Sequence, residues 1–262
     1  MLSFKLFNGV FNIVENILEI KNLTVKVGER TILDSLNLSL GRGEKHVLFG
    51  PNGSGKTSLI MAILGHPRYK IVNGEIWFNG HLINDLSIDE RVRLGLGIAF
   101  QSPPAVRGVK LKHLILKLLG TDMRDVVKTA SFVGIDELLL NRDLNTGFSG
   151  GEAKKSEILQ LIAQDPELLL LDEPDSGVDV ENLELIGKIL RSYFHDRSMM
   201  IITHMGYILR YVKAEKAHVM LDGKIVCSGD ASTILDTILK DGYEWCKRCR
   251  GVRKWEKLRK KL

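Results

Sequence analysis

Cysteine is scarce in this chain, and long apolar runs are missing. Three cysteines in 262 residues, Cys227, Cys246 and Cys249, do not make a disulfide framework, so we expect a reducing, cytoplasmic location. Cys246 and Cys249 have the spacing of half a metal site, but no second pair accompanies them, and unpaired thiols are expected. No stretch approaches the roughly 18 apolar residues that a membrane span requires. Residues 1–14 contain one basic residue, Lys5, so no signal peptide is expected.

Acidic residues are scarce only near the C-terminus. The net charge is +5, but residues 247–262 hold nine Lys or Arg and one acidic residue, Glu256. The rest of the chain is therefore mildly acidic, and the basic character belongs to a terminal segment. That segment is interpreted as a solvated terminal helix with Trp255 and Leu258 packed down. Docking on an acidic scaffold, an anionic membrane or RNA is the alternative.

A glycine-rich motif stands between an apolar stretch and an amphipathic one. Residues 50–57 fit the pattern G-x-x-x-x-G-K-[ST]. A strand, a glycine-rich turn and a helix in this order cradle phosphate, because backbone N–H groups point at the anion and the helix N-terminus adds partial positive charge. Lys56 is expected to reach the β- and γ-phosphates, and the Thr57 hydroxyl to bind Mg²⁺. The predicted nucleotide-binding residues of this loop are Gly50, Pro51, Asn52, Gly53, Ser54, Gly55, Lys56, Thr57 and Ser58.

An acidic pair follows the apolar stretch 168–171. Downstream of a phosphate loop, such a pair predicts one carboxylate that orients hydrated Mg²⁺, Asp172, and one that polarises the attacking water, Glu173. An acidic pair at a strand end can also simply face solvent. The phosphate loop in the same chain favours the catalytic interpretation.

The apolar periodicity predicts an α/β protein with two added lobes. Alternation over 17–40, with a turn at Gly28-Glu29, predicts two or three short antiparallel strands, and residues 74–80 predict a further strand. Helical periodicity over 109–140 predicts a helical lobe inserted in the core. The other expected elements are helices over 87–94 and 150–161 and strands over 96–100, 168–171 and 199–203.

A second glycine-rich helix start lies before the acidic pair, in Phe148-Ser-Gly-Gly-Glu152. One phosphate group cannot easily occupy two such starts of one monomer. This segment, with Gln101, Asp179 and His204 in that order, resembles the ATP-binding cassette (ABC) family. The resemblance implies a P-loop NTPase core with an antiparallel β-lobe and an inserted helical lobe. It also implies an ATP-dependent homodimer, in which the Ser-Gly-Gly start of one chain closes over the γ-phosphate held by the other.

The resemblance further implies roles for single residues. Gln101 would contact Mg²⁺ and sense the helical lobe, and His204 would bind the γ-phosphate. Ser149-Gly150-Gly151 would contact the partner's nucleotide, and Asp179 would cross the dimer interface. An ordinary loop residue for Gln101 and a helix cap for His204 remain alternatives. The expected catalytic residues are Lys56, Gln101, Glu173 and His204, and the expected Mg²⁺ ligands are Thr57, Gln101 and Asp172.

The family usually stacks adenine on an aromatic residue of the first strands. This chain has Val25, Lys26 and Val27 there, and packing of Val27 on the base is the expected substitute. We also hypothesise that Lys154 or Lys155 pairs with Glu173 in a lone subunit and keeps the base idle.

Finer features resemble the SufC group, the soluble ATPase of iron–sulfur cluster assembly. Its partner would be a soluble scaffold of the SufB/SufD kind. Asp175 and Gly177 replace the threonine and alanine common in transport subunits, whereas Pro174 is the transporter-like residue. An ATP-binding subunit that docks on separate membrane permease subunits is the alternative. The stretches that carry the resemblance are Gly65–Tyr69, Ala99–Pro103, Asn145–Glu152, Asp175–Asp179, Cys227–Asp230 and Gly242–Trp245.

The expected organisation is a single ABC ATPase domain over 1–262. Only 92 residues separate Lys56 from Ser149, which excludes the long coiled coil of chromosome-maintenance ATPases. Ribosome-acting relatives generally carry two cassettes, so no nucleic-acid partner is expected. The predicted parts are a catalytic core with the β-lobe (18–100 and 165–245), a helical lobe with the signature (102–164) and a basic tail (246–262).

Overall fold

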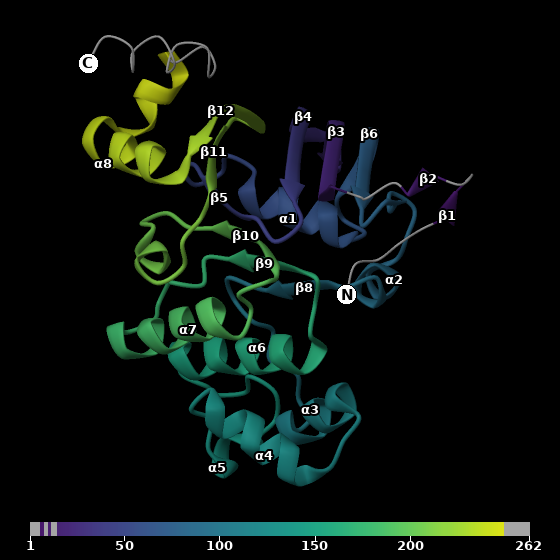
Figure 1. Ribbon diagram of the computed structural model, residues 1–262, viewed down its shortest axis with the longest axis vertical. Coiled ribbons are helices and arrows are strands. Elements are labelled where there is room, and N and C mark those ends of the chain that lie inside the picture. Colours follow the sequence, from purple (N-terminus) through teal and green to yellow (C-terminus); the bar gives the residue numbers. More distant parts are fainter. Residues whose placement is uncertain (1–5, 8–9, 12–14, 249–262) are drawn as a thin grey trace.

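A six-stranded sheet forms the centre of the molecule. The computed structural model describes residues 6–7, 10–11 and 15–248 (Figure 1). The strand order is β12-β11-β5-β10-β9-β8, parallel throughout except for the antiparallel edge strand β12. The strands are β5 (Lys45–Phe49), β8 (Leu96–Ala99), β9 (Leu168–Asp172), β10 (Ser198–Ile202), β11 (Lys216–Leu221) and β12 (Lys224–Asp230).

An antiparallel sheet makes the β-lobe. Its order is β4-β3-β6-β7, and Gly28, at φ 57, lies in the turn between β3 and β4. The alternation over 17–40 gives two antiparallel strands, as predicted, but each is twelve residues long rather than short, and the strand predicted over 74–80 begins earlier. The bounds are β3 (Asn16–Val27), β4 (Arg30–Gly41), β6 (Lys70–Phe78) and β7 (His81–Leu82), with a separate pair, β1 (Leu6–Phe7) and β2 (Val10–Phe11).

The helices occupy three places around the sheets. Helix α1 (Lys56–Leu64) packs with the β-lobe, whereas α6 (Gly150–Gln164) and α7 (Val180–Ser192) lie beside the central sheet (Figure 1). The periodic segment 109–140 divides into three helices at Gly120 and Gly134, both with positive φ. Those helices are α3 (Leu111–Leu119), α4 (Met123–Phe132) and α5 (Glu137–Leu140).

The other helices are short or terminal. Helix α2 (Ile88–Arg93) begins with the capping box of Ser87 and Glu90, as expected for 87–94. The 3₁₀ helix η1 is Tyr207–Arg210, and α8 (Ala231–Arg248) bends at Gly242. No helix in the described part of the chain has the length and apolar character of a membrane span. The expectations for Trp255 and Leu258 fall outside the described residues.

The central sheet separates two apolar cores. Along β5, Val47 and Phe49 pack into the core that contains residues of α6 and α7, whereas Leu48 packs into the core beneath the β-lobe. The alternation follows from the two-residue period of a strand. The four leucines of 168–171 are divided in the same way, because both faces of a parallel strand are covered. An all-apolar strand therefore positions the acidic pair that follows it.

A buried arginine connects the phosphate-loop helix to the β-lobe. Arg91 is 1% exposed, and its guanidinium donates to the carbonyl oxygens of Ala62 and Ile63, in the last turn of α1, at 2.9 and 2.8 Å. It also donates to the carbonyls of Asn84 and Leu86 at 2.9 Å. The positive charge thus lies at the negative end of the helix dipole. These bonds fix α1 against the loop that leaves the β-lobe.

Two buried histidines join β5 to β11. His46 Nδ1 and His218 Nε2 are 3.1 Å apart. The other nitrogens reach the Glu44 carboxylate, 2.9 Å from His46 Nε2, and the Ser228 hydroxyl, 2.7 Å from His218 Nδ1. Glu44 also pairs with Lys216 at 3.1 Å. Burial lowers the pKa of His218 to about 3 and also lowers that of His46.

The histidine pair predicts loss of stability in mild acid. An unfolded histidine has a pKa of about 6.5, so below that pH the unfolded chain binds protons that the folded chain excludes. For His218 the free energy of unfolding should fall as pH drops from about 6.5 toward 3, by up to about 1.4 kcal/mol per pH unit, and the lowered pKa of His46 acts in the same direction. Glu44, whose pKa is lowered from 4.5 to about 2, adds to the loss only below about pH 4.5.

Urea unfolding between pH 7.5 and 5 measures this slope. His218→Gln should flatten it, whereas His113→Gln, at an exposed position of α3, should leave it unchanged. An equal slope in His218→Gln and the unaltered protein would contradict the assignment.

Candidate functional site

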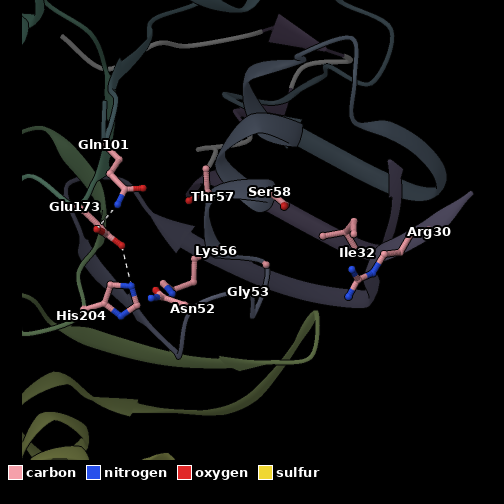
Figure 2. A pocket seen from close by; sticks show the side chains of 11 residues that line it. Arg30, Ile32, Asn52, Gly53, Lys56, Thr57, Ser58, Gln101, Glu173 and His204 are labelled. Carbon is pink, nitrogen blue, oxygen red and sulfur yellow. Dashed lines mark hydrogen bonds and ion pairs between the residues drawn. The ribbon is translucent and has the colours of Figure 1, made fainter. Parts of the chain in front are cut away.

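Four neighbouring parallel strands end at one edge of the central sheet and carry the predicted site residues there. The phosphate loop follows β5, the acidic pair closes β9, His204 follows β10 and Gln101 follows β8. The residues line a cavity of about 540 Å³ (Figure 2). The lining residues are Arg30, Ile32, Asn52, Gly53, Gly55, Lys56, Thr57, Ser58, Gln101, Glu173 and His204.

The phosphate loop is held closed by its own lysine. Lys56 is 5% exposed, and its Nζ donates to the carbonyl oxygens of Gly50 at 2.8 Å and Pro51 at 3.0 Å. Burial lowers its pKa, and the nearby carboxylates oppose that shift. A Cβ at Gly50 would collide with the Met220 carbonyl, so the loop requires glycine there. Of the predicted loop residues, Gly50, Pro51 and Ser54 lie outside the cavity lining.

Glu173 occupies a conformation that few non-glycine residues adopt. Its φ is 50°, and its N–H donates to the Ile202 carbonyl at the end of β10, at 2.9 Å. Both carboxylate oxygens have partners: Gln101 Nε2 donates to Oε2 at 2.6 Å, and His204 Nε2 lies 2.8 Å from Oε1 (Figure 2). The structure thus brings three of the four expected catalytic side chains into direct contact.

Asp172 lies beneath the cavity and is 1% exposed. The Thr57 hydroxyl donates to its carboxylate, and burial raises its pKa. Among the described residues, its Oδ1 has no hydrogen-bond partner. A buried carboxylate oxygen without a partner, beside a hydroxyl at a phosphate loop, suits a hydrated divalent cation. The residues present therefore fit Mg²⁺.

The second glycine-rich start does not reach this cavity. Ser149 caps α6, its Oγ accepting from the Glu152 N–H and its own N–H donating to the Glu152 carboxylate, and it is exposed. A Cβ at Gly150 would lie 2.7 Å from the Gly177 carbonyl, and one at Gly151 2.6 Å from Asn182 Nδ2. These glycines therefore allow the start of α6 to pack closely beside the start of α7.

Asp179 caps the neighbouring helix α7. Its Oδ1 accepts from the Asn182 N–H at 2.8 Å and its Oδ2 from the Asn182 amide at 2.6 Å. These bonds lower the pKa of the exposed carboxyl. Like Ser149-Gly150-Gly151, Asp179 is not among the residues that line the cavity of its own chain.

The expected pairing of Lys154 or Lys155 with Glu173 is wrong. Lys154 Nζ donates to the Phe100 carbonyl at 2.5 Å, and Lys155 Nζ donates to the Gly134 carbonyl at 2.9 Å. Gln101 and His204 hold Glu173 instead. The sequence places both lysines on the helix that begins at Ser149-Gly150-Gly151, but only the fold decides which groups the lysines reach.

Two cavity residues were not predicted. Arg30 and Ile32 of β4 line the end of the cavity opposite Glu173 (Figure 2), and Val27, the expected adenine contact, does not line it. Val27 is the last residue of β3, before the turn at Gly28, whereas Arg30 and Ile32 lie after that turn at the start of β4. The alternation along 30–40 could have indicated which β4 residues share a face, but not that this face meets the phosphate loop.

The comparisons identify the family. The family described as ABC transporter matches residues 33–176, more than half of the chain. The chain belongs to the ABC ATPase family. A probable ABC transporter ATP-binding protein of Streptococcus pyogenes is 40% identical over 241 residues, covering 87% of this chain and 94% of that protein. The probable ATP-dependent transporter ycf16 of Trieres chinensis is 39% identical, covering 88% and 98%.

Solved structures share this ABC ATPase fold. A nucleotide-free ATP-binding cassette from an ABC transporter is 25% identical with a TM-score of 0.70, covering 86% of this chain and 96% of that one. A dimeric post-hydrolysis cassette bound to ADP and phosphate is 24% identical with a TM-score of 0.69, covering 81% and 98%. The expected fold class is confirmed, and the chain is an ATPase that binds ATP.

The cavity lining predicts where the nucleobase binds. The phosphates belong at the loop, so the base should lie at the end formed by Arg30 and Ile32. Ile32→Ala should weaken ATP binding about threefold to tenfold through lost apolar contact. Arg30→Gln should weaken it less, and mainly at low salt, since Arg30 is exposed. Calorimetric titration with ATP measures the affinity of both variants, and Val27→Ala is the matched control. A loss of ATP affinity in Val27→Ala alone would instead support the expected packing of Val27 on the base.

Proposed function

We propose that this ABC ATPase hydrolyses ATP with Mg²⁺ in a head-to-tail dimer and drives a soluble scaffold that assembles iron–sulfur clusters. The observation that supports a dimer is that the predicted site residues of one chain lie in two separate places. One chain supplies the phosphate loop, Gln101, Glu173 and His204 to a cavity that its own Ser149 does not line. At the second glycine-rich start, Ser149 and Gly150 are exposed and Gly151 is buried, so the exposed pair is the part proposed to meet another copy's nucleotide.

Exposed apolar side chains next to two of the predicted site residues support a covering partner. Val180, directly after Asp179, is 74% exposed, and Met205, directly after His204, is 54% exposed. Exposed apolar side chains of this size are typical of a surface that another chain covers. A dimeric cassette bound to ADP and phosphate has the same fold. We therefore assign Ser149-Gly150-Gly151 and Asp179 to the dimer interface.

Glu173 is the proposed general base. In the single chain each of its two carboxylate oxygens contacts a side chain, Oε2 that of Gln101 and Oε1 that of His204. A γ-phosphate bound at Lys56 attracts His204, and the freed Oε1 then accepts a proton from the attacking water as its oxygen bonds to phosphorus and the bond to ADP breaks. Phosphate binding thus releases the base.

Thr57, Asp172 and Gln101 are the proposed holders of Mg²⁺. Bound there, the ion supplies positive charge to the β- and γ-phosphate oxygens. The described residues contain no cluster of three or more His, Cys, Asp or Glu able to hold a metal, so Asp172 would be joined by the Thr57 hydroxyl and the Gln101 amide rather than by further carboxylates. Lys56 is the second source of positive charge, and it must exchange the Gly50 and Pro51 carbonyls for phosphate.

The Glu173→Gln variant tests the dimer and the base together. Without the carboxylate the proton has no acceptor, so turnover should fall at least about a hundredfold. ATP should still bind, and a stable dimer should accumulate with ATP but not with ADP. Phosphate release and light scattering after size exclusion measure the two effects. Normal turnover in the variant would reject the base, and a monomer with trapped ATP would reject the shared site.

The iron–sulfur role is proposed from the SufC-like stretches, one of which has a defined place beside the site. Asp175 Oδ2 accepts from the Thr203 hydroxyl at 2.7 Å and from the Ile208 N–H at 3.3 Å. Asp175 therefore fixes the turn that carries His204. We place the protein in the cytoplasm, with no nucleic-acid partner and with a SufB/SufD-like scaffold.

Transport is the second candidate function. The curated relatives named above are described as ABC transporter ATP-binding protein and ATP-dependent transporter, and Pro174 is the transporter-like residue after the acidic pair. In that case the partner is a membrane permease.

Affinity purification of the full chain from its own cells, with and without detergent, separates the two functions. The expected result is a soluble partner recovered without detergent, whose complex accelerates ATP turnover. An integral membrane partner that co-purifies only from detergent extracts would replace the scaffold with a permease.

A further inference from the structure

Helix α6 carries two buried charged side chains that the proposed chemistry does not use. Lys154 is 4% exposed and Glu157 is 5% exposed, three residues apart on one face. Both point to the end of β8, next to Gln101, rather than to solvent. Residues of these types are rarely buried so fully unless they have specific partners.

Both side chains hold the backbone of one residue, Phe100. Glu157 Oε1 accepts from the Phe100 N–H at 2.6 Å, and Lys154 Nζ donates to the Phe100 carbonyl at 2.5 Å. The two bonds restrain the peptide groups on either side of Phe100. The second of those peptides leads directly into Gln101, whose amide contacts Glu173. A continuous series of contacts therefore runs from α6 to the proposed base.

The pair is not arranged for stability alone. Lys154 Nζ lies 3.7 Å from Glu157 Oε2, and among the described residues that oxygen has no hydrogen-bond partner. Burial raises the pKa of Glu157 to about 7 and lowers that of Lys154. Apolar side chains of similar size commonly fill such a place at equal or lower cost in free energy. What they cannot supply is a donor and an acceptor for the Phe100 backbone.

We propose that Lys154 and Glu157 are positioning residues: they hold the Phe100 backbone so that Gln101 meets Glu173, and they connect the signature start of α6 to the base of the same chain. The connection between two nucleotide sites rests on the proposed dimer. Ser149 begins α6 and engages the partner's γ-phosphate, and Lys154 and Glu157 follow five and eight residues later on the same rigid helix. A shift of α6 at one nucleotide thus moves Gln101 at the other.

The double variant Lys154→Met/Glu157→Leu removes both bonds without leaving a single charge buried. Its kcat should fall at least about tenfold, since small displacements of catalytic groups have effects of that size. Its KM and its Kd for ATP should stay within about threefold. Amide exchange at Phe100 and Gln101 should quicken. Lys155→Met, which loses only the bond to the Gly134 carbonyl, is the control on the same helix and should retain normal kcat.

Glu157→Gln serves as the conservative variant, because its amide oxygen can still accept from the Phe100 N–H. It should keep kcat within about threefold, whereas Glu157→Leu should not. An unchanged kcat in the double variant, or equal losses in Glu157→Gln and Glu157→Leu, would overturn the proposal. A parallel loss of ATP binding and thermal stability would overturn it as well, by showing a purely structural pair.

The experiments distinguish a failure of the proposed dimer from a failure of the proposed positioning role. If Glu173→Gln stays monomeric with ATP, the connection between two sites is lost with the proposed dimer. A comparison of the kcat of Lys154→Met/Glu157→Leu with that of Lys155→Met then still tests whether Lys154 and Glu157 position Gln101 within one chain. If the double variant aggregates, the comparison of Glu157→Gln with Glu157→Leu makes the same decision.

Discussion

The parallel order of four adjacent strands is the constraint on which the site depends. Strands β5, β10, β9 and β8 are hydrogen-bonded neighbours, and all end at the same edge. Because neighbouring strands lie about 4.8 Å apart, groups that follow them in the chain meet within the reach of their side chains. The apolar residues that bury both faces of the sheet thus determine where the phosphate loop, the acidic pair, Gln101 and His204 lie.

Two helices are each anchored to a segment that carries residues of this edge. Helix α6 follows the exposed Ser149, and its Lys154 and Glu157 bond to the Phe100 backbone at the end of β8. Helix α1 is fixed at its other end by Arg91. One helix therefore begins with Lys56 and Thr57 of the phosphate loop, and the other holds the backbone that leads into Gln101. In the proposed mechanism, movement of either helix would change the geometry around Glu173.

The single chain resembles a resting state. Lys56 bonds to carbonyls of its own loop, and Glu173 has both oxygens engaged. In the proposed mechanism ATP displaces these internal partners, and each displacement prepares a catalytic group. The sequence predicts a lysine of α6 as the partner of Glu173, but Gln101 and His204 contact it instead. In the proposed mechanism these two residues also contact Mg²⁺ and the γ-phosphate, so binding of the substrate would release the base.

Local patterns in the sequence determined the strands, most helices, the phosphate loop and the acidic pair, because each depends on residue types within a few positions of one another. The sequence alone also indicated that two glycine-rich starts were too many for one phosphate. Only the tertiary structure decided which β4 residues line the cavity, what Lys154 reaches and how Glu173 is held at positive φ. These features depend on contacts between segments distant in the chain, and side-chain spacing along one helix or strand does not encode what lies opposite it.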